Sequence, residues 1–194
     1  LREVDHADLN GLEALSQISA ERHPGFLNLV NDQDQWKEKI QRSIDSFSDK
    51  IHNKMDGKYV FVSEDHSKSP PSIVGVSMIT AQHGTPASPH FFFEVGSVQK
   101  YSQTINTGFI HGTIRLRFDM DGPTEIGGLL VHPDYRNHEE RIGRQISFIR
   151  FLYIGLHKSK FKRRFLAELL PPLTKKGKSP LWEAVGRRFT NMDY

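Results

Sequence analysis

The stretch Glu125-Ile-Gly-Gly-Leu-Leu-Val-His-Pro-Asp-Tyr-Arg136 predicts a buried strand that ends in a turn. Ile126, Leu129, Leu130 and Val131 form a mostly apolar run of strand length. The strand should end at His132-Pro133-Asp134, because proline has no N–H to donate to a sheet and aspartate favours turns. The rest of the chain is expected to be built around this strand.

Apolar residues recur at three- and four-residue steps after the turn and predict a helix from Gln145 to Leu156. They are Ile142, Ile146, Ile149, Leu152 or Tyr153, and Leu156. A helix with one apolar face packs that face against a sheet. The unit is therefore a strand that leads into a helix lying back on it.

The loop between strand and helix contains Arg141, Ile142, Gly143 and Arg144. A helix N-terminus presents unpaired N–H groups and the positive end of its dipole, so such a loop can hold a phosphate. This strand, turn and helix resembles the acyl-CoA-binding motif of GNAT-type acyltransferases, in which the strand pairs with the pantetheine arm. That motif has arginine or glutamine, two residues, glycine, one residue, then glycine or alanine. Lined up on Gly143, its first glycine is Arg141 here and its leading residue is His138. An ordinary strand-to-helix connection is the alternative.

Composition narrows the class of protein. The chain has 194 residues, a formal net charge of +3 and no cysteine. The length suits one domain with a full core, and the small charge gives no case for nucleic acid. Without cysteine there are no disulfides or thiolate metal sites, which fits a cytoplasmic protein. No apolar run is long enough to span a membrane, so we expect neither a membrane nor a nucleic-acid partner.

Hydrophobic periodicity predicts the other elements in outline. Two helices are expected early in the chain, the first capped at Asp5 and the second beginning near Asn31 or Asp32, with His23-Pro24-Gly25 between them. The expected strands are Arg2–Val4, the hairpin of 59–63 with 73–79, the segments 91–93, 95–98 and 113–118, then Phe165–Leu170 and a last strand from Arg188. Arg115 and Arg117 should share one exposed strand face. Ser179 and Pro180 should open a short helix ending at Gly186.

The order of these segments, with Ser179-Pro-Leu-Trp-Glu-Ala-Val-Gly186 and Phe189-Thr-Asn-Met-Asp-Tyr194, resembles the arginine N-succinyltransferase family over nearly the whole chain. The resemblance implies an α+β fold with α/β/α layers, in which a mixed, mostly antiparallel sheet is flanked by helices. It implies transfer of a succinyl group from succinyl-CoA to the α-amine of arginine, with no other cofactor. Residues 1–194 would form one GNAT-like domain, the N-terminal half of a two-half protein. The family's proton-donating histidine belongs to the other half.

The resemblance also assigns site residues. The family's succinyl-CoA-binding leucine falls on Leu129, and two family glutamates fall on Glu125 and Glu168. Backbone N–H groups from Leu129 through Leu130 to Val131 are candidates for the thioester oxygen, and the glutamates for orienting or deprotonating the amine. No metal site is expected, because the ten histidines include no His-x-x-x-His pair. The alternatives are a GNAT-type acyltransferase of another amine and a non-catalytic domain that binds, regulates or pairs with a second half.

Overall fold

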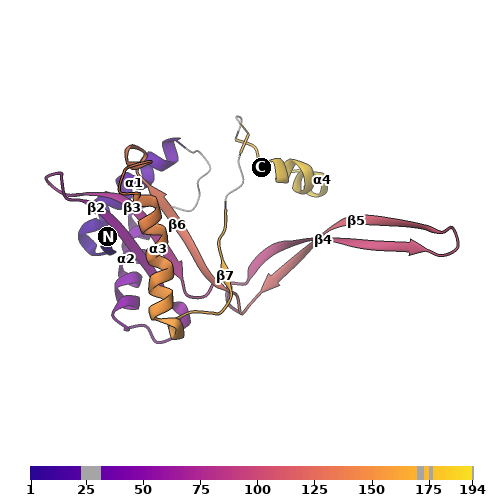
Figure 1. Ribbon diagram of the computed structural model, residues 1–194, viewed down its shortest axis with the longest axis horizontal. Helices are drawn as coiled ribbons and strands as arrows, with labels where there is room; N and C mark the ends of the chain where they lie inside the picture. The colour runs from indigo at the N-terminus through magenta and orange to yellow at the C-terminus, as the bar shows by residue number, and fades with distance from the viewer. Residues whose placement is uncertain (23–31, 170–172, 175–176, 194) are drawn as a thin grey trace.

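The computed structural model describes residues 1–22, 32–169, 173–174 and 177–193. Its main sheet has five strands in the order β1-β2-β3-β6-β7 (Figure 1). The strands are β1 (Arg2–Glu3), β2 (Lys58–Asp65), β3 (Ser72–Thr80), β6 (Thr124–Val131) and β7 (Phe165–Leu166). Neighbours are antiparallel except for β6 and β7, which are parallel. The mixed, mostly antiparallel sheet is therefore confirmed, as is the hairpin of β2 with β3.

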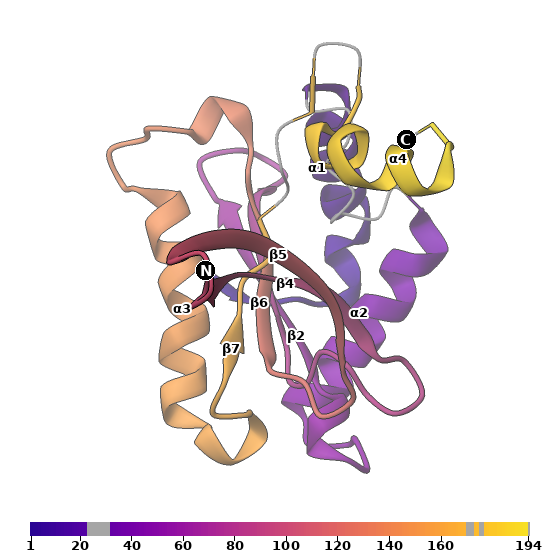
Figure 2. The same ribbon diagram turned by 90° about the vertical axis from the view of Figure 1, so that its right-hand side faces the viewer.

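Helices cover both faces of this sheet. The helices α1 (Leu9–Arg22) and α2 (Gln33–Phe47) lie on one face, and α3 (Ile142–Leu156) lies on the other (Figure 2). Leu12 and Leu15 of α1 and Trp36 of α2 pack with Val60 of β2 and its neighbours. Ile154 of α3 packs with Tyr59 and the apolar residues on the opposite side of the sheet. This arrangement gives the α/β/α layers that the sequence predicts.

Local signals explain where the first helices begin. The Asp5 carboxylate accepts a hydrogen bond from the Ala7 amide, and the Asp8 carboxylate accepts one from the Asp5 amide. This capping box opens the one-turn helix η1 (His6–Asp8), which leads into α1. Asp32 caps α2 by accepting from the Asp34 amide. The break predicted at 23–25, and Asn31 as an alternative cap, lie outside the described residues.

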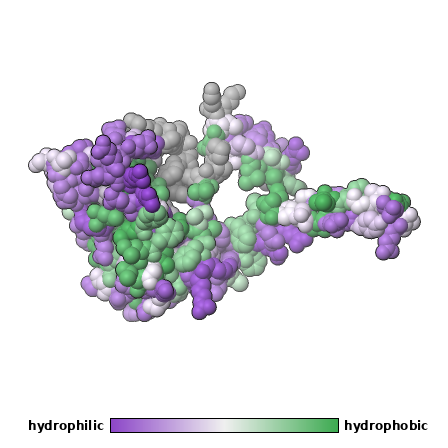
Figure 3. Space-filling view, viewed as in Figure 1, coloured by the Kyte–Doolittle hydropathy of each residue, from purple (hydrophilic) through white to green (hydrophobic). Residues whose placement is uncertain are grey.

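Strands β4 (His90–Ser102) and β5 (Thr107–Asp119) form a separate antiparallel ribbon that projects from the body (Figure 1). We call this ribbon the arm. The predicted short strands are parts of it, and Arg117 pairs with Glu94 at 2.6 Å on one face, as expected for exposed strand charges. The opposite face is largely apolar and is also exposed, and hydrophobic residues are visible along the arm (Figure 3). Seven of its side chains have exposed fractions of 49–77%: Phe91, Phe93, Val95, Ile110, Ile114, Leu116 and Phe118.

The C-terminal part differs from its prediction. Strand β7 has two residues rather than six, and Leu170 lies outside the described residues. The expected last strand from Arg188 is wrong: the chain continues through a π-helical turn, Trp182–Gly186, into the helix α4 (Arg187–Thr190). Gly186 keeps right-handed helical dihedral angles (φ −58°, ψ −48°), and the helix ends at Asn191, which adopts φ +55°. A strand needs a neighbouring edge, and no described strand lies beside this segment.

The central helix also differs in detail. Helix α3 begins at Ile142, three residues earlier than predicted, and its buried face contains Ile142, Ile146, Arg150 and Ile154. Leu156, an expected core position, is 71% exposed; of the alternatives Leu152 and Tyr153, Tyr153 packs against the core and Leu152 is 59% exposed. The remaining helical turns are η2 (Lys54–Asp56), η3 (Pro133–Tyr135) and η4 (Lys158–Lys160). None of the described helices has the length and apolar character that a bilayer span requires.

Candidate functional site

Strand β6 has one edge that is largely open. It pairs with β3 on one side, but with β7 only at Thr124–Phe165 and Glu125–Leu166. Beyond that point β7 leaves the sheet (Figure 1). The open edge therefore runs from Ile126 to Val131, a length of about 20 Å at the usual rise of an extended strand.

A bulge lies in the middle of this edge. Val76 is opposite Leu130 and Met78 is opposite Gly127, so one β3 residue faces both Gly128 and Leu129. Gly128 adopts φ +56°, and a Cβ there would lie 2.7 Å from the Met78 side chain, so glycine is required. Past the bulge the His132 amide donates to the Val74 carbonyl of β3, at 2.8 Å. Because amides alternate along a strand, the Val131 amide points to the open edge.

The three strand residues predicted to bind the acyl donor, Leu129 to Val131, therefore have different surroundings. Leu129, beside the bulge, is 40% exposed, whereas the Leu130 side chain is buried in the core. Val131 offers its amide at the open edge and also lines the cavity at the end of β6. By the same alternation the Leu130 amide points to β3, so Leu130 offers neither its side chain nor its amide at the open edge, where the sequence had placed it as an acyl-donor contact.

A cavity of about 890 Å³ lies where the open edge reaches the start of α3. Its lining includes Arg136, His138, Arg141, Gly143 and Arg144. Arg141 occupies the helix N-cap with φ +53° and ψ +47°, the left-handed conformation that glycine adopts most easily. Within the described residues, no acceptor is present for the Ile142 and Gly143 amides. Several cationic side chains and free amides thus converge on one space, which is the chemistry of a phosphate site.

Tyr135 fixes the loop that forms this cavity. Its hydroxyl donates to the Asp65 carboxylate at the end of β2, which lowers the pKa of Asp65 to about 2. The Lys68 ammonium group lies over the Tyr135 ring, 5.2 Å from its centre. These contacts tie the loop after β6 to the β2–β3 hairpin.

A buried cation lies beneath the bulge. Arg150 of α3 is 5% exposed and donates to the Gly127 carbonyl at 3.3 Å and to the Ser147 hydroxyl at 2.9 Å. Burial lowers the pKa of Arg150, and no carboxylate pairs with it among the described residues. Arg150 thus holds the bulge in place and supplies positive charge under the open edge.

Four polar side chains meet at the other end of β6. His83 Nδ1 lies 2.9 Å from Glu125 Oε2, and His83 Nε2 lies 2.8 Å from His90 Nδ1. Glu168 Oε1 is 3.9 Å from His83 Nε2 and 3.8 Å from His90 Nδ1. The two glutamates selected from the sequence therefore converge on the same imidazole. Their chemical roles remain a proposal.

Neither histidine was predicted, because the two are seven residues apart and do not form a His-x-x-x-His pair. His83 follows β3 and His90 opens β4, so a loop brings them together. His83, His90 and Glu168 offer three ligand atoms within 4.8 Å of one another, which is a possible metal site that the histidine spacing did not predict. A search for histidine pairs at both ends of a short loop between strands would have selected them.

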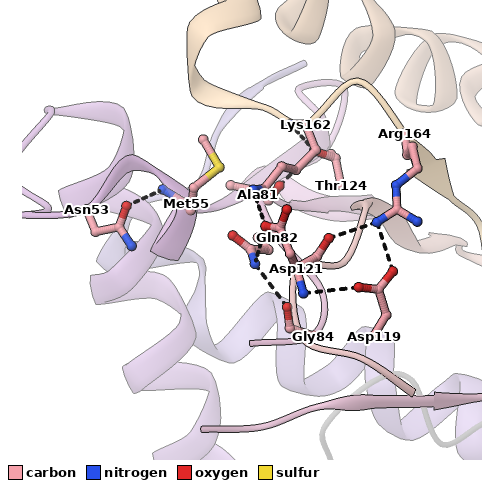
Figure 4. A network of polar contacts seen from close by, with 10 residues as sticks. All are labelled: Asn53, Met55, Ala81, Gln82, Gly84, Asp119, Asp121, Thr124, Lys162 and Arg164. Carbon is pink, nitrogen blue, oxygen red and sulfur yellow. Dashed lines mark hydrogen bonds and ion pairs between the residues drawn. The ribbon is translucent and has the colours of Figure 1, made fainter. Parts of the chain in front are cut away.

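Hydrogen bonds at the root of the arm hold this loop (Figure 4). The buried Thr124 hydroxyl donates to the Ala81 carbonyl at 2.7 Å, and Arg164 donates to the Asp119 carboxylate at 2.8 Å. The His83 amide donates to the Pro123 carbonyl at 2.7 Å. A Cβ on Gly122 would lie only 1.6 Å from the His83 carbonyl oxygen, so glycine allows the two loops to approach.

Two adjoining cavities share His83. One, of about 590 Å³, is lined by Arg42, Lys58, His90 and Glu168 among others. The other, of about 280 Å³, includes Lys39, Glu125 and the bulge residues Gly127 and Gly128. Burial lowers the pKa of Lys39, and the nearby Lys58 lowers it further. The polar cluster is thereby connected to the open edge of β6.

This geometry agrees with comparisons to known proteins. The family model for the arginine N-succinyltransferase beta subunit matches residues 1–194. The chain belongs to the arginine N-succinyltransferase family. The arginine N-succinyltransferases of Photorhabdus laumondii and Salmonella schwarzengrund are 30% and 28% identical to it, over 193 and 194 residues. Both matches cover 100% of this chain and 54% of the relative, so the chain spans about half the length of the curated relatives it matches.

A solved structure supports the fold of this family member. The arginine/ornithine succinyltransferase subunit AI of Pseudomonas aeruginosa matches with a TM-score of 0.83 and 24% identity. The match covers 100% of this chain and 56% of that one. Together with the mixed sheet and its flanking helices, it confirms the GNAT-like α+β fold.

Proposed function

We propose that this chain is one GNAT-like half of an arginine N-succinyltransferase, which moves a succinyl group from succinyl-CoA to the α-amine of arginine. One observation carries the proposal. The open edge of β6 joins a basic turn at the start of α3 to a cavity that contains Glu125, the match to a family glutamate. An extended acyl donor with a phosphate end and a thioester end fits such a site.

The phosphate end is assigned to the turn from Arg141 to Arg144. Arginine side chains bind phosphate through paired N–H groups, and the free amides of Ile142 and Gly143 add donors at the positive end of the α3 dipole. The pantetheine amides would pair with the open edge as a further strand does, using the Val131 amide and its neighbours. The thioester would then lie near the bulge at Gly128 and Leu129.

The acceptor end is assigned to the cavities beside His83. Arginine carries a cationic guanidinium group, and Glu125 and Glu168 supply the negative charge to orient it. In the reaction the neutral amine attacks the thioester carbonyl, an amide bond forms, and the carbon–sulfur bond breaks. The amine proton must leave, and the CoA thiolate must gain one. The glutamates are candidates for the first step, and the second step is assigned to the other half of the protein.

The second half is also proposed from the arm. The seven exposed apolar side chains on one arm face offer roughly 900 Å² of surface, at about 200 Å² for a full side chain. The largest apolar patch on a monomer is usually smaller than this, and domains of one chain share interfaces of this size. The relatives have almost as much chain again beyond the match. We therefore assign the arm face to the second half, in a cytoplasmic enzyme of arginine breakdown.

Release of the CoA thiol tests the function. Succinyl-CoA is incubated with arginine and, separately, with ornithine and lysine, and thiol release is followed with and without Glu125→Gln. We expect release that depends on arginine and falls in the variant. Faster thiol release with ornithine or lysine than with arginine would show that another amine is the acceptor. Thiol release no faster than the spontaneous hydrolysis of succinyl-CoA, also after the second half of the gene product is added, would support a non-catalytic half instead.

A further inference from the structure

We propose that His83, His90 and Glu168 bind a divalent transition-metal ion of the zinc type at the mouth of the 590 Å³ cavity. Binding of the ion does not depend on the proposed function. The prediction that the ion inhibits the reaction rests on the proposed function.

The distances between the three ligand atoms fit one ion. His83 Nε2, His90 Nδ1 and Glu168 Oε1 form a triangle with sides of 2.8, 3.9 and 3.8 Å. The centre of the circle through these corners lies about 2.1 Å from each of them, and zinc bonds to imidazole nitrogen and carboxylate oxygen are about 2.0–2.2 Å long. An ion at this point would replace the hydrogen bond between the two rings with two metal bonds after small ring rotations.

His83 already has the arrangement of a metal ligand. The Glu125 carboxylate lies beside the other ring nitrogen of His83, with Oε2 2.9 Å from Nδ1. Nε2 faces His90 and Glu168, and its hydrogen bond with His90 Nδ1 is the contact that an ion would replace. Metal-bound histidines commonly donate their second N–H to a carboxylate in this way, which fixes the ring and strengthens the bond.

The two histidines are held by the surrounding fold, and the donor set is selective. The His90 side chain is 13% exposed, and the His83 backbone donates to Pro123. Two imidazoles and one carboxylate suit zinc and related ions, whereas calcium and magnesium prefer oxygen ligands alone. All three ligand residues line the 590 Å³ cavity, so an ion among them would be reached from it. A water molecule or a substrate group could occupy the ion's fourth coordination position.

A bound ion would change the acceptor site. It would neutralise Glu168 and place positive charge where the arginine guanidinium is expected. The proposal therefore predicts that zinc inhibits transfer in competition with arginine and leaves succinyl-CoA binding unchanged.

The test is titration of the full chain with Co²⁺, whose visible absorption reports nitrogen and carboxylate ligation, followed by displacement with Zn²⁺. We expect one site per chain. His83→Ala, His90→Ala and Glu168→Gln should each weaken Co²⁺ binding more than tenfold, and Glu125→Gln should weaken it about 10- to 100-fold. His111→Ala, on the exposed arm, is the matched control and should bind as the wild type does.

Thermal melts of every variant identify any loss of folding. Absence of saturable binding by the wild type would overturn the proposal, as would equal affinity in the folded Glu168→Gln variant and the wild type. Metal binding without transferase activity would support this site and count against the proposed function, so the two can fail separately.

Discussion

Replacing Arg141 by glycine should change stability and acyl-CoA binding in opposite directions. Arg141 has φ +53°, and the left-handed conformation costs an L-residue about 1–2 kcal/mol, which glycine avoids. Glycine gains about 0.5–1 kcal/mol more freedom in the unfolded chain. The net stability change should therefore lie between zero and about 1.5 kcal/mol in favour of the variant, or up to roughly 6 °C in Tm.

The same substitution removes a cation from the cavity assigned to phosphate. A hydrogen bond to a charged group contributes about 1.5–3 kcal/mol, so succinyl-CoA affinity should fall by roughly 10- to 100-fold. Titration calorimetry measures the affinity and a thermal melt measures stability. A stabilised variant with weaker binding is the expected result.

Asn137→Gly is the matched control. Asn137 lines the same cavity and has φ +63°, but it carries no charge. Its replacement should leave affinity unchanged and alter stability only slightly, because asparagine tolerates this conformation. Equal or tighter binding by Arg141→Gly would refute the assignment of Arg141 to phosphate.

Three further predictions concern other parts of the account. Gly143→Glu should weaken succinyl-CoA binding with little loss of stability, since a carboxylate is stabilised at a helix N-terminus but repels phosphate. Gly143→Ala is the control, because its Cβ would lie at an ordinary contact distance of 3.6 Å from Val131. Unchanged affinity in the glutamate variant would contradict the phosphate site. Tyr135→Phe should lower Tm above pH 4, and the difference from the wild type should shrink as the pH falls toward 2. The Tyr135 hydrogen bond lowers the pKa of Asp65 to about 2, so its contribution to stability is present above the ordinary carboxyl pKa and is lost as Asp65 is protonated near pH 2. A constant Tm difference across that pH range would show that the bond to Asp65 is not responsible. When the proposed second half is absent, the chain should self-associate through the arm. Leu116→Asp should reduce this association in sedimentation velocity, while Arg115→Gln on the opposite face should not. Equal association in both variants would exclude the face that contains Leu116.

Local patterns predicted the unit around β6 well. Proline at 133 ended the strand, and the apolar spacing after it placed α3 on the sheet. The capping box at Asp5 and Asp8 formed as expected. These features depend on residues a few positions apart, which a sequence displays directly.

Features that depend on distant neighbours were not predictable in the same way. The segment from Arg188 became helical because no described strand edge lies beside it, and β7 stops after Leu166, where it separates from β6. The approach of His83 to His90 depends on two loops meeting at Gly122. The spacing of the histidines in the sequence does not predict that these two loops come together.

The most direct test of the central claim is calorimetric titration of this chain with succinyl-CoA, with acetyl-CoA and free CoA alongside. The account predicts one saturable site per chain that prefers succinyl-CoA and is weakened by Arg141→Gly. Absence of binding to all three compounds, also with the second half of the gene product present, would contradict the assignment of the β6 edge and the α3 turn to acyl-CoA.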